Sequence, residues 1–254
     1  MGHEAKNPVK ATRRSFDVLE TLYEMDNARL TDIADALDLP DSTVHNHLST
    51  LVECGFVTKD DDVYRVSLRF LTFGEFARSR YKISDASRRE LTDLTGETSE
   101  SASVVVAEDG LGYVLAHKPG DTDLPIDLYP GKRVPLHATS FGKVILADLP
   151  DETVDEIVDQ RGLAACTAET IIDRSALFDE LATIRSQGYA VCDEERLRGV
   201  RSLSMAVRSE GGIAVGAIGI TGPTSRLTQN RLRGSLLDTL THTKNVIELK
   251  LTYS

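Results

Sequence analysis

The stretch that decides the fold is residues 30–51, which read LTDIADALDLPDSTVHNHLSTL. Its apolar residues recur at the three- and four-residue spacing of two short amphipathic helices. Leu39-Pro40 separates the two runs, because proline disfavours helical backbone at the residue before it. We predict Thr31 as the N-cap of the first helix, and Asp41 or Ser42 as the N-cap of the second.

The flanking sequence completes a small domain. An earlier helix is predicted from about Pro8, with an apolar stripe of Phe16, Leu19, Leu22 and Tyr23. Gly55 is placed to end the helix that begins near residue 41. Two β-prone runs, 56–59 and 63–66, then flank the acidic turn 60–62 and predict a hairpin. Three helices followed by such a wing are typical of a winged helix-turn-helix that reads DNA.

The third helix has one face for the core and other faces for contacts. Val44, Leu48 and Leu51 form its predicted buried row. The polar residues left outside this row are the candidate DNA contacts: Ser42, Thr43, His45, Asn46 and Ser49. Asparagine can bind adenine through two hydrogen bonds, and hydroxyls can hold phosphate. The alternative is a helix pair that contacts only protein.

Cations near this helix are few. Arg13 and Arg14 lie off the apolar stripe and either reach the DNA backbone or are plain surface charge. Lys59 and Arg65 on the hairpin are candidate phosphate contacts, although the acidic turn 60–62 would repel DNA. His45 and His47 are two apart on a helix and point to different faces, so no metal site is predicted.

The composition is acidic, with 29 Lys+Arg against 40 Asp+Glu and a net charge of −11 over 254 residues. Taken alone, this argues against nucleic-acid binding. An acidic surface is also an adaptation to high salt, where phosphate contacts contribute little affinity; a salt-loving source is therefore a hypothesis. There is no apolar run of about 18 residues and no signal-peptide pattern. Three distant cysteines are typical of a cytoplasmic protein.

The rest of the chain predicts a second domain. Residues 68–82 form either a linker helix that packs on a second copy or a core helix of the first domain. Strands are predicted at 101–107, 112–117, 125–128, 189–192, 203–208 and 213–220, and helices at 84–96, 138–147, 151–160, 174–187 and 229–251. This order favours an α+β sheet with helices on one side. The predicted domains are 1–67, a linker helix at 68–83, and 84–254.

Three motifs lie in this second domain. They are PLHATSFGKVILA at 135–147, GYAVCDEE at 188–195 before Gly199-Val200, and ITGP at 220–223 before Arg226. In this order behind a winged helix-turn-helix, they resemble the IclR family of transcriptional regulators over essentially the whole chain. The resemblance implies a GAF-like effector-binding domain, a homodimer or homotetramer on a palindromic operator, a small carboxylate effector and no cofactor.

The family's effector positions carry over to Val134, Ser140, Phe141, Cys192, Val200, Ser202, Gly219 and Thr221. Ser140 would open a helix, whose free N–H groups attract a carboxylate. Phe141 stands where relatives often have a small residue, Cys192 where they often have Asp, and Ser202 where they often have Cys. The resemblance therefore implies a sugar-derived or aromatic acid instead of a two-carbon acid. Asp41 and Asn46 likewise stand where relatives often carry Lys and Arg.

Two other functions remain open for the second domain. It can be an oligomerisation module that binds no ligand. It can also be an enzyme, with Cys192 as nucleophile and His117 or His137 as base, although nothing in the sequence fixes that geometry. Ordinary packing is the alternative for each pocket residue. We predict a transcription regulator of a catabolic pathway and no enzyme.

Overall fold

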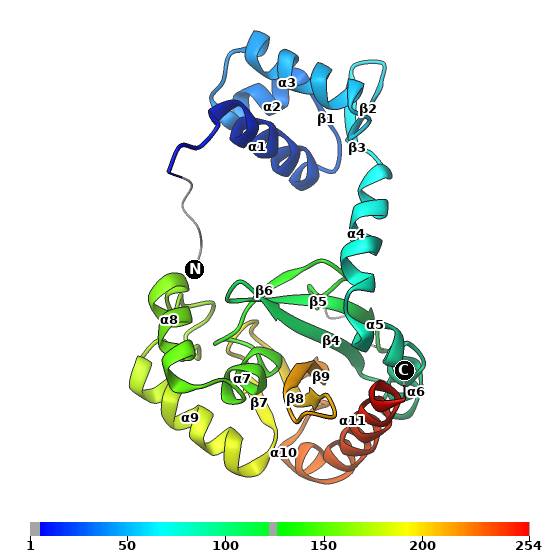
Figure 1. Ribbon diagram of the computed structural model, residues 1–254, viewed down its shortest axis with the longest axis vertical. Coiled ribbons are helices and arrows are strands. Elements are labelled where there is room, and N and C mark those ends of the chain that lie inside the picture. The colour runs from blue at the N-terminus through cyan, green and yellow to red at the C-terminus, as the bar shows by residue number, and fades with distance from the viewer. Residues whose placement is uncertain (1–5, 122–125, 254) are drawn as a thin grey trace. The chain divides into compact units, whose positions relative to one another are not determined.

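The computed structural model describes residues 6–121 and 126–253 of the chain (Figure 1). The chain divides into two compact units, with Ala77 in the first and Arg78 in the second. This division falls inside helix α4 (Arg69–Ser79). Within the described ranges, no helix has both the length and the apolar character needed to cross a membrane. The domain boundaries at 67 and 83 stay a prediction.

The first unit is the predicted winged helix-turn-helix. Its helices are α1 (Lys10–Glu24), α2 (Leu30–Leu37) and α3 (Asp41–Glu53). Its strands are β1 (Ala28–Arg29), β2 (Val57–Asp60) and β3 (Val63–Val66), in the antiparallel order β1-β3-β2. The two-residue β1 was not predicted, because so short a strand leaves no alternating pattern.

The buried row of α3 is confirmed. Val44 and Leu48 are fully buried and Leu51 nearly so. The predicted stripe of α1 was partly wrong, because Phe16 is 58% exposed and Tyr23 59% exposed. Their place in the core is taken by a residue that the spacing did not single out, Val18, which is fully buried together with the predicted Leu22.

The helix starts differ from the predicted caps. Helix α2 begins at Leu30, and the carboxylate of Asp32 accepts a hydrogen bond of 2.9 Å from the backbone N–H of Arg29. Thr31 is therefore inside the helix. Helix α3 follows Pro40 directly, so Asp41 and Ser42 are its first helical residues and not its cap.

The end of α3 is the predicted glycine turn. Gly55 has a φ of +77°. The N–H of Phe56 donates to Leu51 O and that of Gly55 to Val52 O, each at 2.9 Å. This pair of bonds is the Schellman motif, which satisfies carbonyls that the helix leaves free. It directs the chain into β2 and so sets the position of the wing.

The second unit is built on one antiparallel sheet in the order β6-β5-β4-β9-β8-β7. The strands are β4 (Ser101–Glu108), β5 (Leu111–Lys118), β6 (Arg133–Pro135), β7 (Ala190–Asp193), β8 (Val200–Arg208) and β9 (Ala214–Pro223). The strand predicted at 125–128 was wrong for Ile126 to Leu128, which form none; Pro125 lies outside the described residues. The edge is formed by β6 instead.

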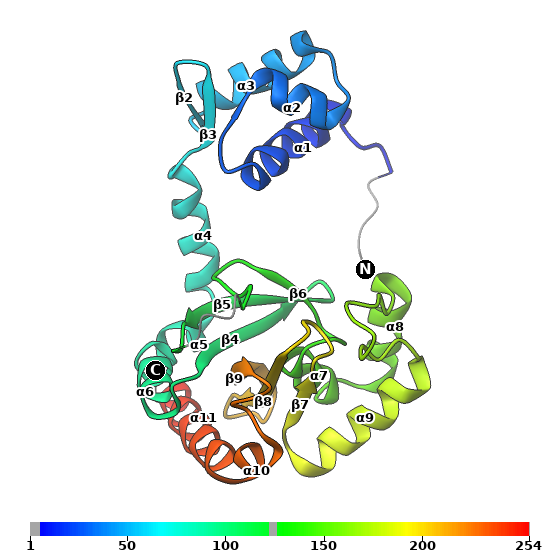
Figure 2. The same cartoon turned by 180° about the vertical axis from the view of Figure 1, so that it is seen from behind.

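Helices cover both faces of this sheet (Figures 1 and 2), so the prediction of one covered face was wrong. One face carries α7 (Ser140–Ala147), α8 (Asp151–Arg161) and α9 (Arg174–Gln187). The other carries α5 (Lys82–Ala86), α6 (Arg88–Thr98) and α11 (Leu237–Thr252). Before α11 lie α10 (Gln229–Arg231) and the segment η1 (Leu232–Leu236), kinked at Gly234. Each face has its own apolar core.

Candidate functional site

The outer face of α3 is the first candidate site. Ser42, His45, Asn46 and Ser49 are exposed on it, and Thr43 is half-buried. The buried row on the opposite face fixes this orientation. The structure therefore presents all five predicted side chains on one helix, as a recognition helix requires.

Helix α3 is also tied to α1 by a polar contact. The hydroxyl of Ser15 lies 2.9 Å from Nδ1 of His47, which is half-buried. His45 is exposed, so the two histidines do point to different faces. In the described part of the chain, no group of three or more His, Cys, Asp or Glu is arranged to hold a metal ion.

The predicted cationic contacts are exposed. On the wing, Arg65 pairs with Asp60 at 3.3 Å, and the ammonium of Lys59 lies 5.3 Å from the centre of the Tyr64 ring. An exposed ion pair contributes only about 0–1 kcal/mol, and an exposed contact between a cation and a ring is similarly weak. Arg65 and Lys59 therefore remain available to bind a phosphate. Arg13 and Arg14 are exposed on α1.

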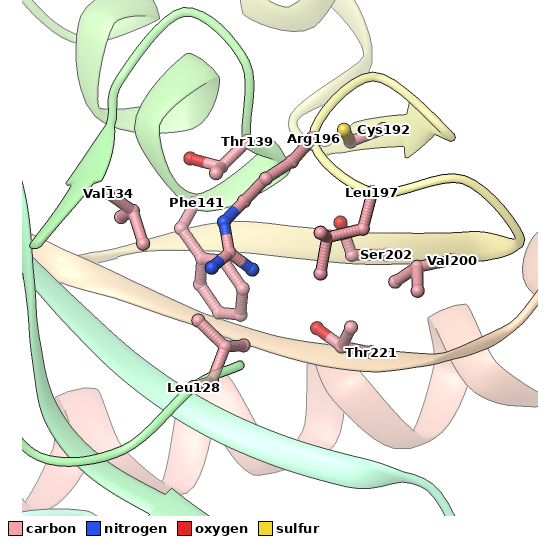
Figure 3. A pocket seen from close by; sticks show the side chains of 10 residues that line it. All are labelled: Leu128, Val134, Thr139, Phe141, Cys192, Arg196, Leu197, Val200, Ser202 and Thr221. Carbon is pink, nitrogen blue, oxygen red and sulfur yellow. The ribbon is translucent and has the colours of Figure 1, made fainter. Parts of the chain in front are cut away.

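The second candidate site is a cavity of about 20 Å³ in the second unit (Figure 3). It lies between the sheet, the start of α7 and the loop after β7. The residues that line it are Leu128, Val134, Thr139, Phe141, Cys192, Arg196, Leu197, Val200, Ser202 and Thr221. This volume is about that of one water molecule, so an organic ligand enters only if lining side chains move.

Six of the eight predicted effector residues line the cavity, and Ser140 and Gly219 do not. The hydroxyl of Ser140 is buried against the hydroxyls of Ser202 and Ser204, at 2.7 and 2.6 Å. A methyl group at Gly219 would clash with the hydroxyl of Ser204, and it would lie 2.6 Å from the carbonyl of Leu203 and 2.8 Å from the Phe141 ring. Gly219 therefore makes room for strand β8 and for the phenylalanine that lines the cavity.

The polar side of the cavity is a row across three strands. Cys192 pairs with Ser202, and Ser202 with Thr221, in the register of β7, β8 and β9. Directly opposed residues point to the same face of a sheet. The hydroxyl of Thr221 is buried, and it has no hydrogen-bond partner within the described residues. Buried hydroxyls are normally paired, so Thr221 offers a bond to a ligand.

Cys192 is a neutral thiol. It donates to the carbonyl of Ala138 at 3.3 Å. Burial, aided by the nearby carboxylate of Glu195, raises the pKa of the Cys192 thiol to about 12. The thiolate that a nucleophile requires is therefore scarce at neutral pH.

Sequence reasoning missed four lining residues: Leu128, Thr139, Arg196 and Leu197. Arg196 is the most informative, because its side chain is only 15% exposed. Burial lowers the pKa of Arg196, and the carboxylate of Asp127 opposes this shift. The one signal in the sequence is its position between Glu195 and Gly199-Val200, which does not reveal that its side chain is buried.

A buried ion pair supports the loop that carries Arg196. Lys143, on α7, is 1% exposed and its ammonium lies 2.5 Å from Glu195 and 3.5 Å from Glu180. The carbonyl of Glu195 also accepts hydrogen bonds from Thr167 and Thr170. These contacts hold the end of β7 against α7, and so fix one wall of the cavity.

Comparison with known proteins decides the family. The model of the IclR helix-turn-helix domain matches residues 11–61, and that of the bacterial transcriptional regulator IclR C-terminal domain matches residues 76–248. The chain belongs to the IclR family. An IclR-family chain is a transcriptional regulator, and the first of the two matched domains is its DNA-binding domain.

Three relatives place the chain within the IclR family. It is 27% identical over 247 residues to a probable HTH-type transcriptional regulator, ArcR, of Halobacterium salinarum, covering 96% of this chain and 94% of that one. A putative transcriptional regulator from Rhodococcus sp. RHA1 has a TM-score of 0.82 at 28% identity, covering 96% and 98%. The inducer-binding domain of a double mutant of PobR from Acinetobacter, in complex with 3-hydroxybenzoic acid, has a TM-score of 0.61 at 28% identity, covering 65% and 96%.

Proposed function

We propose that this IclR-family regulator binds a palindromic operator as a homo-oligomer, and that a small aromatic acid in the second unit changes its operator affinity. The observation that carries the effector part is the cavity with its unpaired Thr221 hydroxyl. A polyhydroxylated sugar acid needs many hydrogen-bond partners, whereas half of the lining here is aliphatic or aromatic. An aromatic ring with one or two polar groups suits such a lining better.

A relative supports this class of effector. The inducer-binding domain of a double mutant of PobR is in complex with 3-hydroxybenzoic acid, an aromatic ring with a carboxylate and a hydroxyl. In this chain, the row of Cys192, Ser202 and Thr221 offers thiol and hydroxyl groups to a ring substituent. The side chains of Val134, Phe141 and Val200 line the cavity and would enclose the ring.

For DNA, the proposed contacts are those of α3, with Asn46 reading a base edge and the hydroxyls and His45 holding phosphate or base edges. Arg13, Arg14, Lys59 and Arg65 would contact phosphates. Palindromic recognition requires two copies of the winged helix-turn-helix. Support for a homo-oligomer comes from apolar side chains at the start of α4, where Leu68 is 82% exposed and Leu71 61% exposed. A dimer and a tetramer would both cover them.

An enzymatic role is the weaker alternative. The candidate nucleophile Cys192 is held neutral, with a pKa raised to about 12. The candidate bases are occupied, since His117 bonds to Ser103 and His137 to the carbonyl of Ala164. We therefore assign no catalytic residue. We propose that the protein acts in the cytoplasm, with the DNA that it regulates.

The test is binding of operator DNA by the full-length protein, with and without 3-hydroxybenzoate. The operator is first selected from a random-sequence pool. We expect a shift of operator affinity of about 5- to 150-fold, which is the usual range of allosteric coupling. If the protein binds its operator but calorimetry detects no bound benzoate, the second unit would instead be an oligomerisation module that binds no ligand.

A further inference from the structure

Arg196 is the only charged residue among the ten described residues that line the cavity. Its side chain is 15% exposed, and it points toward Phe141 and Leu128 (Figure 3). A cation that is largely removed from water is costly unless an anion or strong hydrogen bonds compensate it. The partners of this guanidinium therefore decide what the cavity can bind.

The partners of Arg196 in the described residues are few. Its Nη2 donates to the carbonyl of Asp127 at 2.8 Å, and lies 3.5 Å from the carboxylate of the same residue. A guanidinium has five N–H donors. Nη1 and Nε, which carry three of them, have no partner in the described part of the chain.

The carboxylate of Asp127 is held more closely by another cation. The ammonium of Lys132 lies 2.6 Å from its Oδ2, against 3.5 Å for Arg196. Asp127 is also half exposed to solvent, at 48%. The negative charge of Asp127 therefore stays compensated by Lys132 and solvent if Arg196 moves away. A change of partner by Arg196, from Asp127 to the carboxylate of a ligand, then costs little free energy.

We propose that Arg196 binds the carboxylate of the effector, which takes the place of the Asp127 carboxylate. The assignment rests on the proposed function, and it names the residue that selects acids. A planar guanidinium holds a carboxylate through two parallel hydrogen bonds. The predicted anchor Ser140 is instead committed to two other serines. The exchange replaces the 3.5 Å contact of Arg196 with the Asp127 carboxylate and leaves its 2.8 Å hydrogen bond to the Asp127 carbonyl in place, so Arg196 stays joined to that segment while it holds the ligand.

The experiment is calorimetric titration of the full-length protein with 3-hydroxybenzoate and with its neutral analogue 3-hydroxybenzamide. Arg196→Gln should weaken binding of the acid by about 10- to 100-fold, the effect of one charge-assisted hydrogen-bonded pair, and that of the amide by less than about 3-fold. Arg198→Gln is the matched control, because Arg198 is exposed, lies two residues away and does not line the cavity. It should change neither affinity.

A second variant is expected to bind the acid more tightly, so its test does not rest on a loss of affinity. Asp127→Asn removes the competing carboxylate, and it should tighten binding of the acid while that of the amide is unchanged. Unaltered acid affinity in Arg196→Gln, or weaker acid binding in Asp127→Asn, would overturn the assignment of Arg196 and leave the proposed function standing. Failure of the wild-type protein to bind any of a set of benzoates would overturn both.

Discussion

Lys143→Met tests the packing on which the pocket depends. Methionine keeps much of the aliphatic volume of Lys143 but leaves the carboxylate of Glu195 buried without its ammonium partner, which now lies at 2.5 Å. Glu195 has one oxygen without any hydrogen-bond partner in the described residues already. Removing one member of a buried ion pair costs about 3–5 kcal/mol. The second pair, to the partly exposed Glu180 at 3.5 Å, adds at most about 1 kcal/mol.

We therefore expect Lys143→Met to lower the free energy of unfolding by about 3–5 kcal/mol, measured by urea denaturation followed by circular dichroism. Replacing both Lys143 and Glu195 by Met removes the ion pair and leaves no unpaired charge from it. The double variant should then be more stable than the sum of the single changes predicts, by at least about 1 kcal/mol. Additive effects, or a single change below about 1 kcal/mol, would refute the view that this pair holds the loop against α7.

Three further predictions concern separate features. Asn46→Ala should weaken operator binding by about 10- to 100-fold in a gel-shift assay, since one bidentate base contact is worth about 1–3 kcal/mol. Thr50→Ala is the control, because the Thr50 hydroxyl donates to the carbonyl of Asn46 within the helix. Unchanged affinity of the Asn46 variant would contradict the assignment. Because burial raises the pKa of Cys192 to about 12, a thiol reagent at pH 8 should label the exposed Cys54 and Cys166 rapidly and the buried Cys192 only after unfolding. Rapid labelling of all three thiols would be the contrary result. If the net charge of −11 is an adaptation to salt, the unfolding temperature should rise from low to molar KCl, and a constant value would exclude that origin.

The winged helix-turn-helix was predictable because each of its signals is local. The helical spacing of Val44, Leu48 and Leu51 fixes the buried face of α3, and Gly55 fixes its end. The errors at Phe16 and Tyr23 come from the same method. An apolar residue on a short amphipathic helix can lie on the edge of the stripe, and only the tertiary contacts decide whether it is buried.

The pocket was less predictable because it depends on contacts between distant segments. The family's effector positions identified six lining residues, but Ser140 proved to be bonded to Ser204, which lies 64 positions away. Arg196 was missed because the basic residues around it look like surface charge in the sequence. Its burial depends on how the loop after β7 folds back over the sheet, and no local pattern records that.

The most direct test of the central claim is fluorescence anisotropy of a selected operator with the full-length wild-type protein, titrated with 3-hydroxybenzoate at constant salt. Salt is held fixed because protein–DNA affinity depends steeply on it. The expected result is a saturable change in operator affinity of at least about 5-fold, with no change when 3-hydroxybenzamide replaces the acid. Operator affinity that stays constant while calorimetry shows the acid bound would contradict the claim that the pocket controls DNA binding.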